Sequence, residues 1–186
     1  KFLIFATKKK FKQLRNIPMT ICFSKDNFLK RATYIKFLGV RIDQHVNWDS
    51  HIEDITRKIA KTIGILYKCR HYLPINLLTN LYYSFIYPYI SYCTLTWGSN
   101  YQTKLKPIHI LQKRAIRAIL FADNRTPSKP LFSKLQILTI YEITRMQQAE
   151  FTYKRLNNLL PETIFDDCIQ PIGHRYNTRS KANKKL

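Results

Sequence analysis

Between residues 50 and 68, apolar side chains recur at the spacing of one face of an α-helix. At 100° per residue a single stripe is formed by Ile52, Ile55, Ile59, Ile63 and Leu66. Arg57, Lys61 and Lys68 fall on the opposite side. Ser50 and Glu53 stand just ahead of the stripe in the S-x-x-E spacing of a capping box. The pattern predicts an amphipathic helix with an apolar face against a core and a cationic face outside.

The next segment, from His71 to Thr103, has no Asp, Glu, Lys or Arg and holds seven of the twelve tyrosines. Pro74 suits the first turn of a helix over 75–87, and Pro88 the start of a shorter one ending near Trp97. We expect a buried helical hairpin. An interfacial or spanning segment is the alternative, although the run never reaches 18 consecutive apolar residues.

A second amphipathic helix is predicted over 104–120. Its apolar stripe contains Ile108, Leu111, Ala115 and Ile119. On the other side Lys106, Lys113 and Arg117 align, with Arg114 adjacent to them. A loop over 123–130, a short helix from Leu131 and a longer one over 139–158 follow, and the last is apolar on several sides, as for a helix with more than one neighbour.

The first 43 residues predict short strands at 2–6, 19–24 and 34–43, joined by basic loops around 8–12 and 30–31. Phe37 is expected in the core, since it lies in a strand pattern. The predicted fold is mainly α with a small β part. We divide it into strands over 1–43, a helical region over 44–160 and a basic, disordered tail over 161–186.

The charge balance points to a polyanionic partner. The chain has 32 Lys and Arg against 11 Asp and Glu, a net charge of +21. Solubility does not require so much charge of one sign, and nucleic acid is the commonest polyanion. We expect phosphate contacts from two helices, with Arg57, Lys61, Lys113 and Arg117 lining one concavity and Lys68, Lys106 and Arg114 beside them. The other interpretation is a solvated helix face.

Catalytic patterns are incomplete. Phe121–Asn124 (FADN) has the shape of a reverse-transcriptase F-x-D-D box with one carboxylate lost, and Phe165–Asp167 (FDD) has paired carboxylates in a helical context. We interpret both as surface acids. The cysteines and histidines lack the spacing of a zinc site. No complete active site, metal or cofactor is expected in this chain.

An ordered series of motifs resembles one family. YIKFLGVRID is followed by NWDSHIEDI, LYYSFIYPYISYC, TWGS, LQKRAIRAIL, LFSKLQIL and finally YNTRS. Over about residues 34–180 this series resembles the region downstream of the catalytic core in reverse transcriptases of non-LTR, LINE-type, jockey-like retrotransposons.

The resemblance implies a fragment made of the last palm strands, a helical thumb and a basic tail. Phe37, Leu38 and Gly39 match the family's L-G strand, a hairpin near the primer terminus. The implied function is to position an RNA–DNA or RNA template–primer duplex inside the cell. The metal-binding aspartates, with the Mg²⁺ of the complete polymerase, would lie upstream of Lys1. So would the fingers, the rest of the palm and the endonuclease segment, the implied protein partners.

Two alternatives remain open from the sequence. In one, the chain is a helical interaction module whose tyrosine-rich hairpin docks on another protein and whose basic faces serve solubility. In the other, it is a decayed copy of an element. A membrane-surface role is the least favoured.

Overall fold

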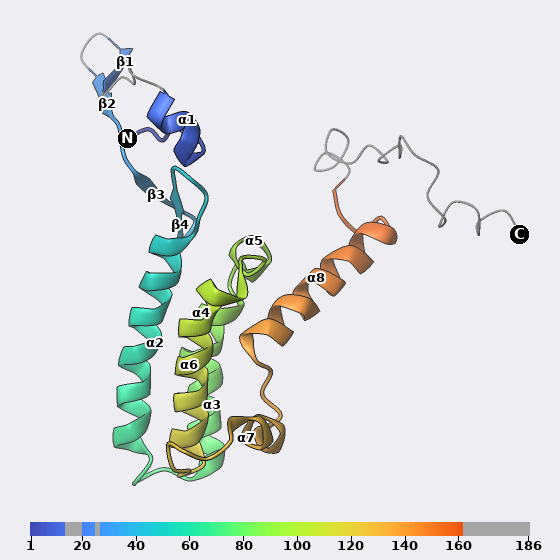
Figure 1. Cartoon of the computed structure of the whole chain (residues 1–186). Helices are drawn as coiled ribbons and strands as arrows, with labels where there is room; N and C mark the ends of the chain where they lie inside the picture. The colour runs from blue at the N-terminus through green and yellow to red at the C-terminus, as the bar shows by residue number, and fades with distance from the viewer. Residues whose placement is uncertain (14–19, 25–26, 162–186) are drawn as a thin grey trace, which may run out of the picture. The chain divides into compact units, whose positions relative to one another are not determined.

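The computed structural model describes residues 1–13, 20–24 and 27–161 (Figure 1). The strands are β1 (Thr20–Ser24), β2 (Asn27–Lys30), β3 (Tyr34–Phe37) and β4 (Val40–Asp43). The helices are α1 (Lys8–Gln13), α2 (Asp49–Cys69), α3 (Ile75–Phe85), α4 (Tyr87–Ser91), α5 (Thr94–Trp97), α6 (Gln102–Ile119), α7 (Ser128–Leu135) and α8 (Ile140–Leu156). The chain is mainly helical with a small antiparallel strand part, as predicted. Most of the predicted tail and Phe165–Asp167 lie outside the described residues.

Residues 1–148 form one compact unit, which carries both sheets and α1 to α7. The second unit begins within α8 at Ala149. Its described part contains one ion pair across a helical turn, between Lys154 and Glu150 at 2.7 Å.

The β3–β4 hairpin turns on two residues. Leu38 has φ 44° and Gly39 has φ 83°. Positive φ at both positions is the geometry of a type I′ turn, whose twist matches that of the strands, and glycine adopts it without strain. β4 packs on α2 and buries Val40, whereas its β3 partner Phe37 is 61% exposed. The prediction that Phe37 belongs to the core is therefore wrong, because only the β4 side of the hairpin end is covered.

The segment predicted as a basic loop over 8–12 is instead helix α1. Its first turn is closed by Thr7, whose carbonyl accepts from the Phe11 amide at 2.9 Å. The Phe11 ring meets His45 edge-on at 5.3 Å and lies 4.7 Å from the Arg31 guanidinium. These distant partners stabilise a turn that has no local apolar pattern. The strand expected at 2–6 is reduced to one bridge, from Phe2 to Arg31, and β2 stands where a basic loop was expected.

Helix α2 begins differently from the prediction. Its N-cap is Trp48, in the left-handed region at φ 63°, so Ser50 lies inside the helix and forms no capping box with Glu53. The turn before the helix is fixed by Asp43. Its carboxylate accepts from the amides of His45 at 2.8 Å, Asn47 at 3.2 Å and Trp48 at 2.9 Å.

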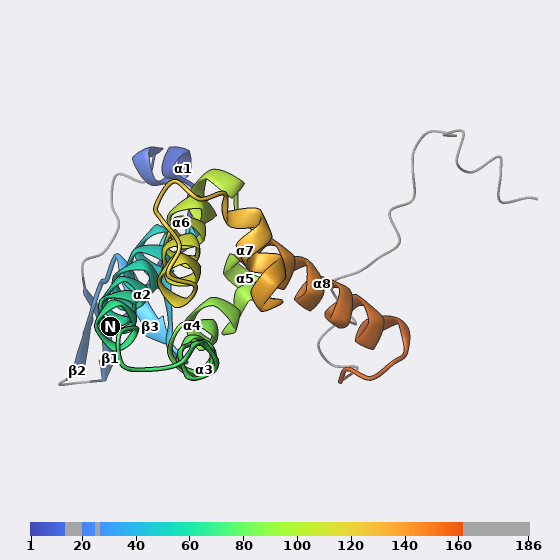
Figure 2. The same ribbon diagram turned by 90° about the horizontal axis from the view of Figure 1, so that it is seen from below.

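The core lies among α2, α3 and α6, each of which contacts the other two (Figures 1 and 2). Both predicted apolar stripes are buried, from Ile52 to Leu66 on α2 and from Ile108 to Ile119 on α6. Asp49 at the start of α2 pairs with Lys104 at the start of α6, and Tyr67 near the end of α2 shares a pocket with Arg117 near the end of α6. The two helices therefore run parallel.

The charge-free segment is helical as predicted but is buried on one side only. Its core residues are Leu78, Tyr82, Ile86, Ile90 and Trp97. Its large exposed residues include Leu77, Tyr83, Phe85, Tyr89 and Tyr92. Among the described helices, none has both the length and the apolar composition to cross a membrane.

A buried glutamine joins α6 to the α7–α8 connection. Gln112 donates to the Tyr82 hydroxyl at 2.9 Å and to the Leu138 carbonyl at 3.2 Å, and it accepts from the Ile140 amide at 2.8 Å. Ile140 is the first residue of α8, so Gln112 satisfies an amide that the helix itself cannot. Burial raises the pKa of Tyr82 far above its usual value.

Helix α8 has the capping box that α2 lacks. The Glu142 carboxylate accepts from the Thr139 amide at 2.7 Å, and the Thr139 hydroxyl accepts from the Glu142 amide at 3.4 Å. Burial on several sides was expected along this helix. Within the first unit, however, only its first turns are buried, at Ile140, Ile143 and Thr144, and Met146 is 43% exposed.

Candidate nucleic-acid interface

The cations predicted on α2 lie on its outer face. Arg57, Lys61 and Lys68 are all exposed, on the side of the helix opposite its buried isoleucines. Arg57 is paired with Glu53 one turn earlier, at 3.1 Å. An exposed pair of this kind contributes little stability, so it leaves the Arg57 guanidinium available to a stronger anion.

The cations predicted on α6 occupy different environments. Lys106 and Arg114 are exposed, and Lys113 is half-buried. Arg117 donates from Nε at 3.2 Å and from Nη2 at 2.9 Å to the Thr126 carbonyl. Its guanidinium thus holds the α6–α7 loop, a role that its charge and spacing in the sequence did not reveal.

Lys113, Arg114 and Arg117 meet in a pocket of about 480 Å³ between the C-terminal ends of α2 and α6. The remaining lining residues are Tyr67, Ile110 and Asn124. We call these six residues the cationic pocket. Arg57 and Lys61 are not in its lining, so the structure does not gather the four expected cations into one concavity.

The N-terminal ends of the same helices enclose a different site. A pocket of about 310 Å³ there is lined by Asp49, Ile52, Glu53, Thr56, Lys104 and Pro107. Lys104 pairs with Asp49. We call this the acidic end. The pockets at the two ends of the α2–α6 groove therefore differ in charge, with two carboxylates and one lysine at one end and three cations at the other.

Two groups near the start of α2, the buried His51 and the half-buried Asp54, have shifted pKa values. Burial lowers the pKa of His51, whose Nδ1 accepts from the Arg41 amide at 3.3 Å. Burial alone would raise the pKa of Asp54, but its hydrogen bond to Lys58 and the charges of Lys58 and Arg41 outweigh that effect and lower it. At neutral pH this site therefore holds an uncharged imidazole beside an ionised carboxylate.

The hairpin tip that matches the L-G motif is tied to the helical region. The Tyr92 hydroxyl donates to the Leu38 carbonyl at 2.6 Å, and the Tyr92 ring lies 3.5 Å from where a Cβ on Gly39 would stand. Leu38 itself is 73% exposed. The tip thus presents Phe37 and Leu38 outward from a fixed position. Tyr92 had no sequence signal that distinguished it from its neighbouring tyrosines.

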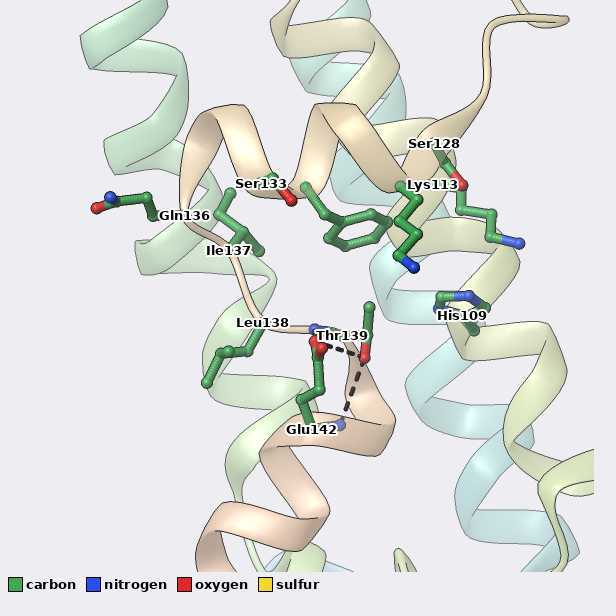
Figure 3. Close-up of a pocket in the computed structure, with 11 residues that line it drawn as sticks. His109, Lys113, Ser128, Ser133, Gln136, Ile137, Leu138, Thr139 and Glu142 are labelled. Carbon is green, nitrogen blue, oxygen red and sulfur yellow. Dashed lines mark hydrogen bonds between the residues drawn. The ribbon is translucent and has the colours of Figure 1, made fainter.

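A pocket of about 640 Å³ lies between α6 and α7 (Figure 3). His109 and Lys113 project into it from α6, and Phe132 and Ile137 give it an apolar wall. Burial, together with the charge of Lys113, lowers the pKa of His109. The Glu142 carboxylate at its edge is engaged in capping α8, and the Thr139 hydrogen bonds lower its pKa. This carboxylate therefore has a structural role.

The residues of the incomplete catalytic patterns form no metal centre in the part of the chain that can be seen. Asp123 lies in the loop after α6, where its carboxylate accepts from the Asn124 amide at 2.6 Å. Within the described residues, no three His, Cys, Asp or Glu side chains are grouped so as to hold a metal ion.

Comparison of the chain with protein-family models, curated proteins and solved structures finds no match.

Proposed function

We propose that this chain binds a nucleic-acid duplex and positions it, as the thumb region of a non-LTR reverse transcriptase holds its template–primer. The observation that carries the proposal is the cationic pocket, where Lys113, Arg114 and Arg117 meet at one end of two parallel helices. Side chains of this kind bind phosphates without reading the base sequence. The resemblance of the motif series from the L-G hairpin to LQKRAIRAIL is the ground on which we propose this particular family.

The rest of the surface supports the same role. The outer face of α2 adds three exposed cations, and the whole chain has a net charge of +21. The exposed Phe37–Leu38 tip offers an apolar contact beside the duplex, where the family places its primer terminus. Polymerisation itself would need the aspartates and Mg²⁺ of the upstream palm.

The test is binding of the purified chain to a fluorescent RNA–DNA duplex. Lys113 and Arg114 are changed together to Glu, while Arg117 is kept because it holds the loop at Thr126. We expect the affinity at low salt to fall by about tenfold or more, since two attractive charges become repulsive. As a matched control, Lys129 and Lys134 on α7 are changed to Glu. An equal loss of affinity in both double variants would show that binding depends only on the net charge of the chain, and would overturn the proposal.

A second function is favoured by the exposed apolar residues of α3 and α4, which include Leu77, Tyr83 and Phe85. Exposed apolar residues of this size are typical of protein contacts when they form one patch. In this view the chain docks through them on the polymerase core. The Lys113/Arg114 reversal separates the two functions, because it removes duplex binding and leaves such docking intact.

A further inference from the structure

We infer that the cationic pocket takes one unpaired nucleotide of a bound nucleic acid, with its base against aromatic rings and its phosphate on Lys113 and Arg114. This inference rests on the proposed function, and it specifies which part of the nucleic acid the cationic pocket binds. A cavity of about 480 Å³ is within the range of small-ligand sites and is large enough for a nucleotide.

The pocket combines the groups that a nucleotide requires. Lys113 and Arg114 supply positive charge for a phosphate, and Tyr67 and Ile110 supply an apolar wall. Asn124 brings an amide, with one acceptor and two donors for a base edge. A bare phosphate would contact only the cations, and an apolar ligand would contact only Tyr67 and Ile110, so a nucleotide matches the lining better than either.

An aromatic–arginine stack extends this wall. The Arg70 guanidinium lies 5.1 Å from the Tyr67 ring centre and 5.5 Å from that of Phe121. The Phe121 ring is half exposed and also meets His71 edge-on at 6.4 Å. Bases stack on aromatic faces and on guanidinium planes alike, and such stacking is independent of sequence. Paired bases inside a duplex are already stacked, so this surface selects an unpaired one.

Phe121 also occupies a strained position. It follows α6 at φ 55°, and the next amide, from Ala122, closes the helix end on the Arg117 carbonyl at 3.0 Å. Glycine usually takes this left-handed position at a helix end. A phenylalanine there is strained, because in this conformation its Cβ comes too close to the following carbonyl oxygen. A half-exposed aromatic ring at such a site therefore indicates a use for the ring outside folding.

The test compares three versions of one short RNA–DNA duplex: blunt, with a one-nucleotide adenosine overhang, and with an abasic overhang that keeps the phosphate. We expect the adenosine overhang to bind the full chain about 5- to 50-fold more tightly than the abasic one. Equal affinity for these two overhangs overturns the inference while the proposed function stands. Failure of all three duplexes to bind overturns the proposed function itself.

Phe121→Gly separates the role of the ring from folding. Glycine suits the left-handed backbone, so the variant should keep or raise the melting temperature while losing most of the preference for adenosine. The matched control is Tyr101→Ala, which removes an exposed ring beyond the other end of α6 and should leave the preference intact. A preference for adenosine that is unchanged in Phe121→Gly contradicts stacking of the base on this ring.

Free AMP as competitor distinguishes a nucleotide within a strand from a soluble nucleotide. Competition at micromolar AMP would assign the pocket to the soluble nucleotide instead.

Discussion

The two ends of the α2–α6 pair are built from the same parallel helices and differ in charge and in the way each is closed. At the acidic end, the Asp43 carboxylate accepts hydrogen bonds from three backbone amides in the turn before α2, and Asp49 and Glu53 line the pocket. At the cationic end, Arg117 holds the α6–α7 loop, and Lys113 and Arg114 border the groove beside Tyr67. Helix packing alone therefore does not decide what such a groove can bind. The position of a few charges along it does.

The largest effect is expected from breaking the polar link beside the cationic end. Gln112→Leu leaves the buried Tyr82 hydroxyl and Ile140 amide, and the partly buried Leu138 carbonyl, without this partner. Each buried group without a partner costs about 1–3 kcal/mol. We expect the free energy of unfolding in urea to fall by about 3 kcal/mol or more. Tyr82→Phe, which removes one hydroxyl, should cost about 1 kcal/mol. Equal losses in both variants would show that the Gln112 hydrogen bonds to Leu138 and Ile140 add nothing to stability.

A smaller effect concerns pH at the opposite end. Burial lowers the pKa of His51 below its usual value of 6.5; the charge of Asp54 opposes this shift, and those of Lys58 and Arg41 add to it. Below about pH 6.5 the unfolded chain binds a proton that the folded chain does not, so stability is complete above that pH and falls as the pH drops towards the folded-state pKa. His51→Gln should reduce the loss of melting temperature between about pH 7.5 and 5.5. His71→Gln, at an exposed position, should leave this loss of melting temperature unchanged. An equal reduction in His71→Gln would show that the buried imidazole of His51 is not the cause.

The smallest effect tests how separate the two ends are. Asp49 lies eighteen residues before Tyr67 on α2, roughly 27 Å along the helix. That exceeds the Debye length of about 10 Å at 0.1 M salt. Asp49→Asn should therefore change duplex affinity by less than about twofold at that salt. A gain of about tenfold would place the nucleic acid along the whole groove.

Sequence periodicity was sufficient for the main helices, because the isoleucines of α2 and the stripe of α6 face a core along their whole length. The residues themselves predicted one strand over 34–43, where the structure has β3, a turn at Leu38–Gly39 and β4; the hairpin was indicated only by the family resemblance. Helix α1 could not be predicted, since Phe11 is held by His45 and Arg31 from distant segments. Ser50–Glu53 and Thr139–Glu142 show the same limit. Both have the capping-box spacing, but only Thr139 directly precedes its helix, whereas Ser50 lies inside α2.

The candidate site was predicted in part. Charge and spacing selected Lys113 and Arg114, which the structure places in the lining of the cationic pocket. They could not distinguish these from Arg117, whose charge is engaged by a backbone carbonyl nine residues away. Tyr67 and Phe121 gave no signal either, because their importance depends on the ring and guanidinium distances around Arg70.

The central claim is that phosphates are held at the cationic end, and the salt dependence of duplex binding tests it most directly. Log affinity should fall linearly with log salt, and Lys113→Gln with Arg114→Gln should reduce the steepness by about 1.8, or 0.9 for each lost phosphate contact. The double variant Lys61→Gln with Lys68→Gln on α2 also removes two positive charges, and it should reduce the slope by less. An unchanged slope in the first pair, with the full reduction in the second, would contradict the account.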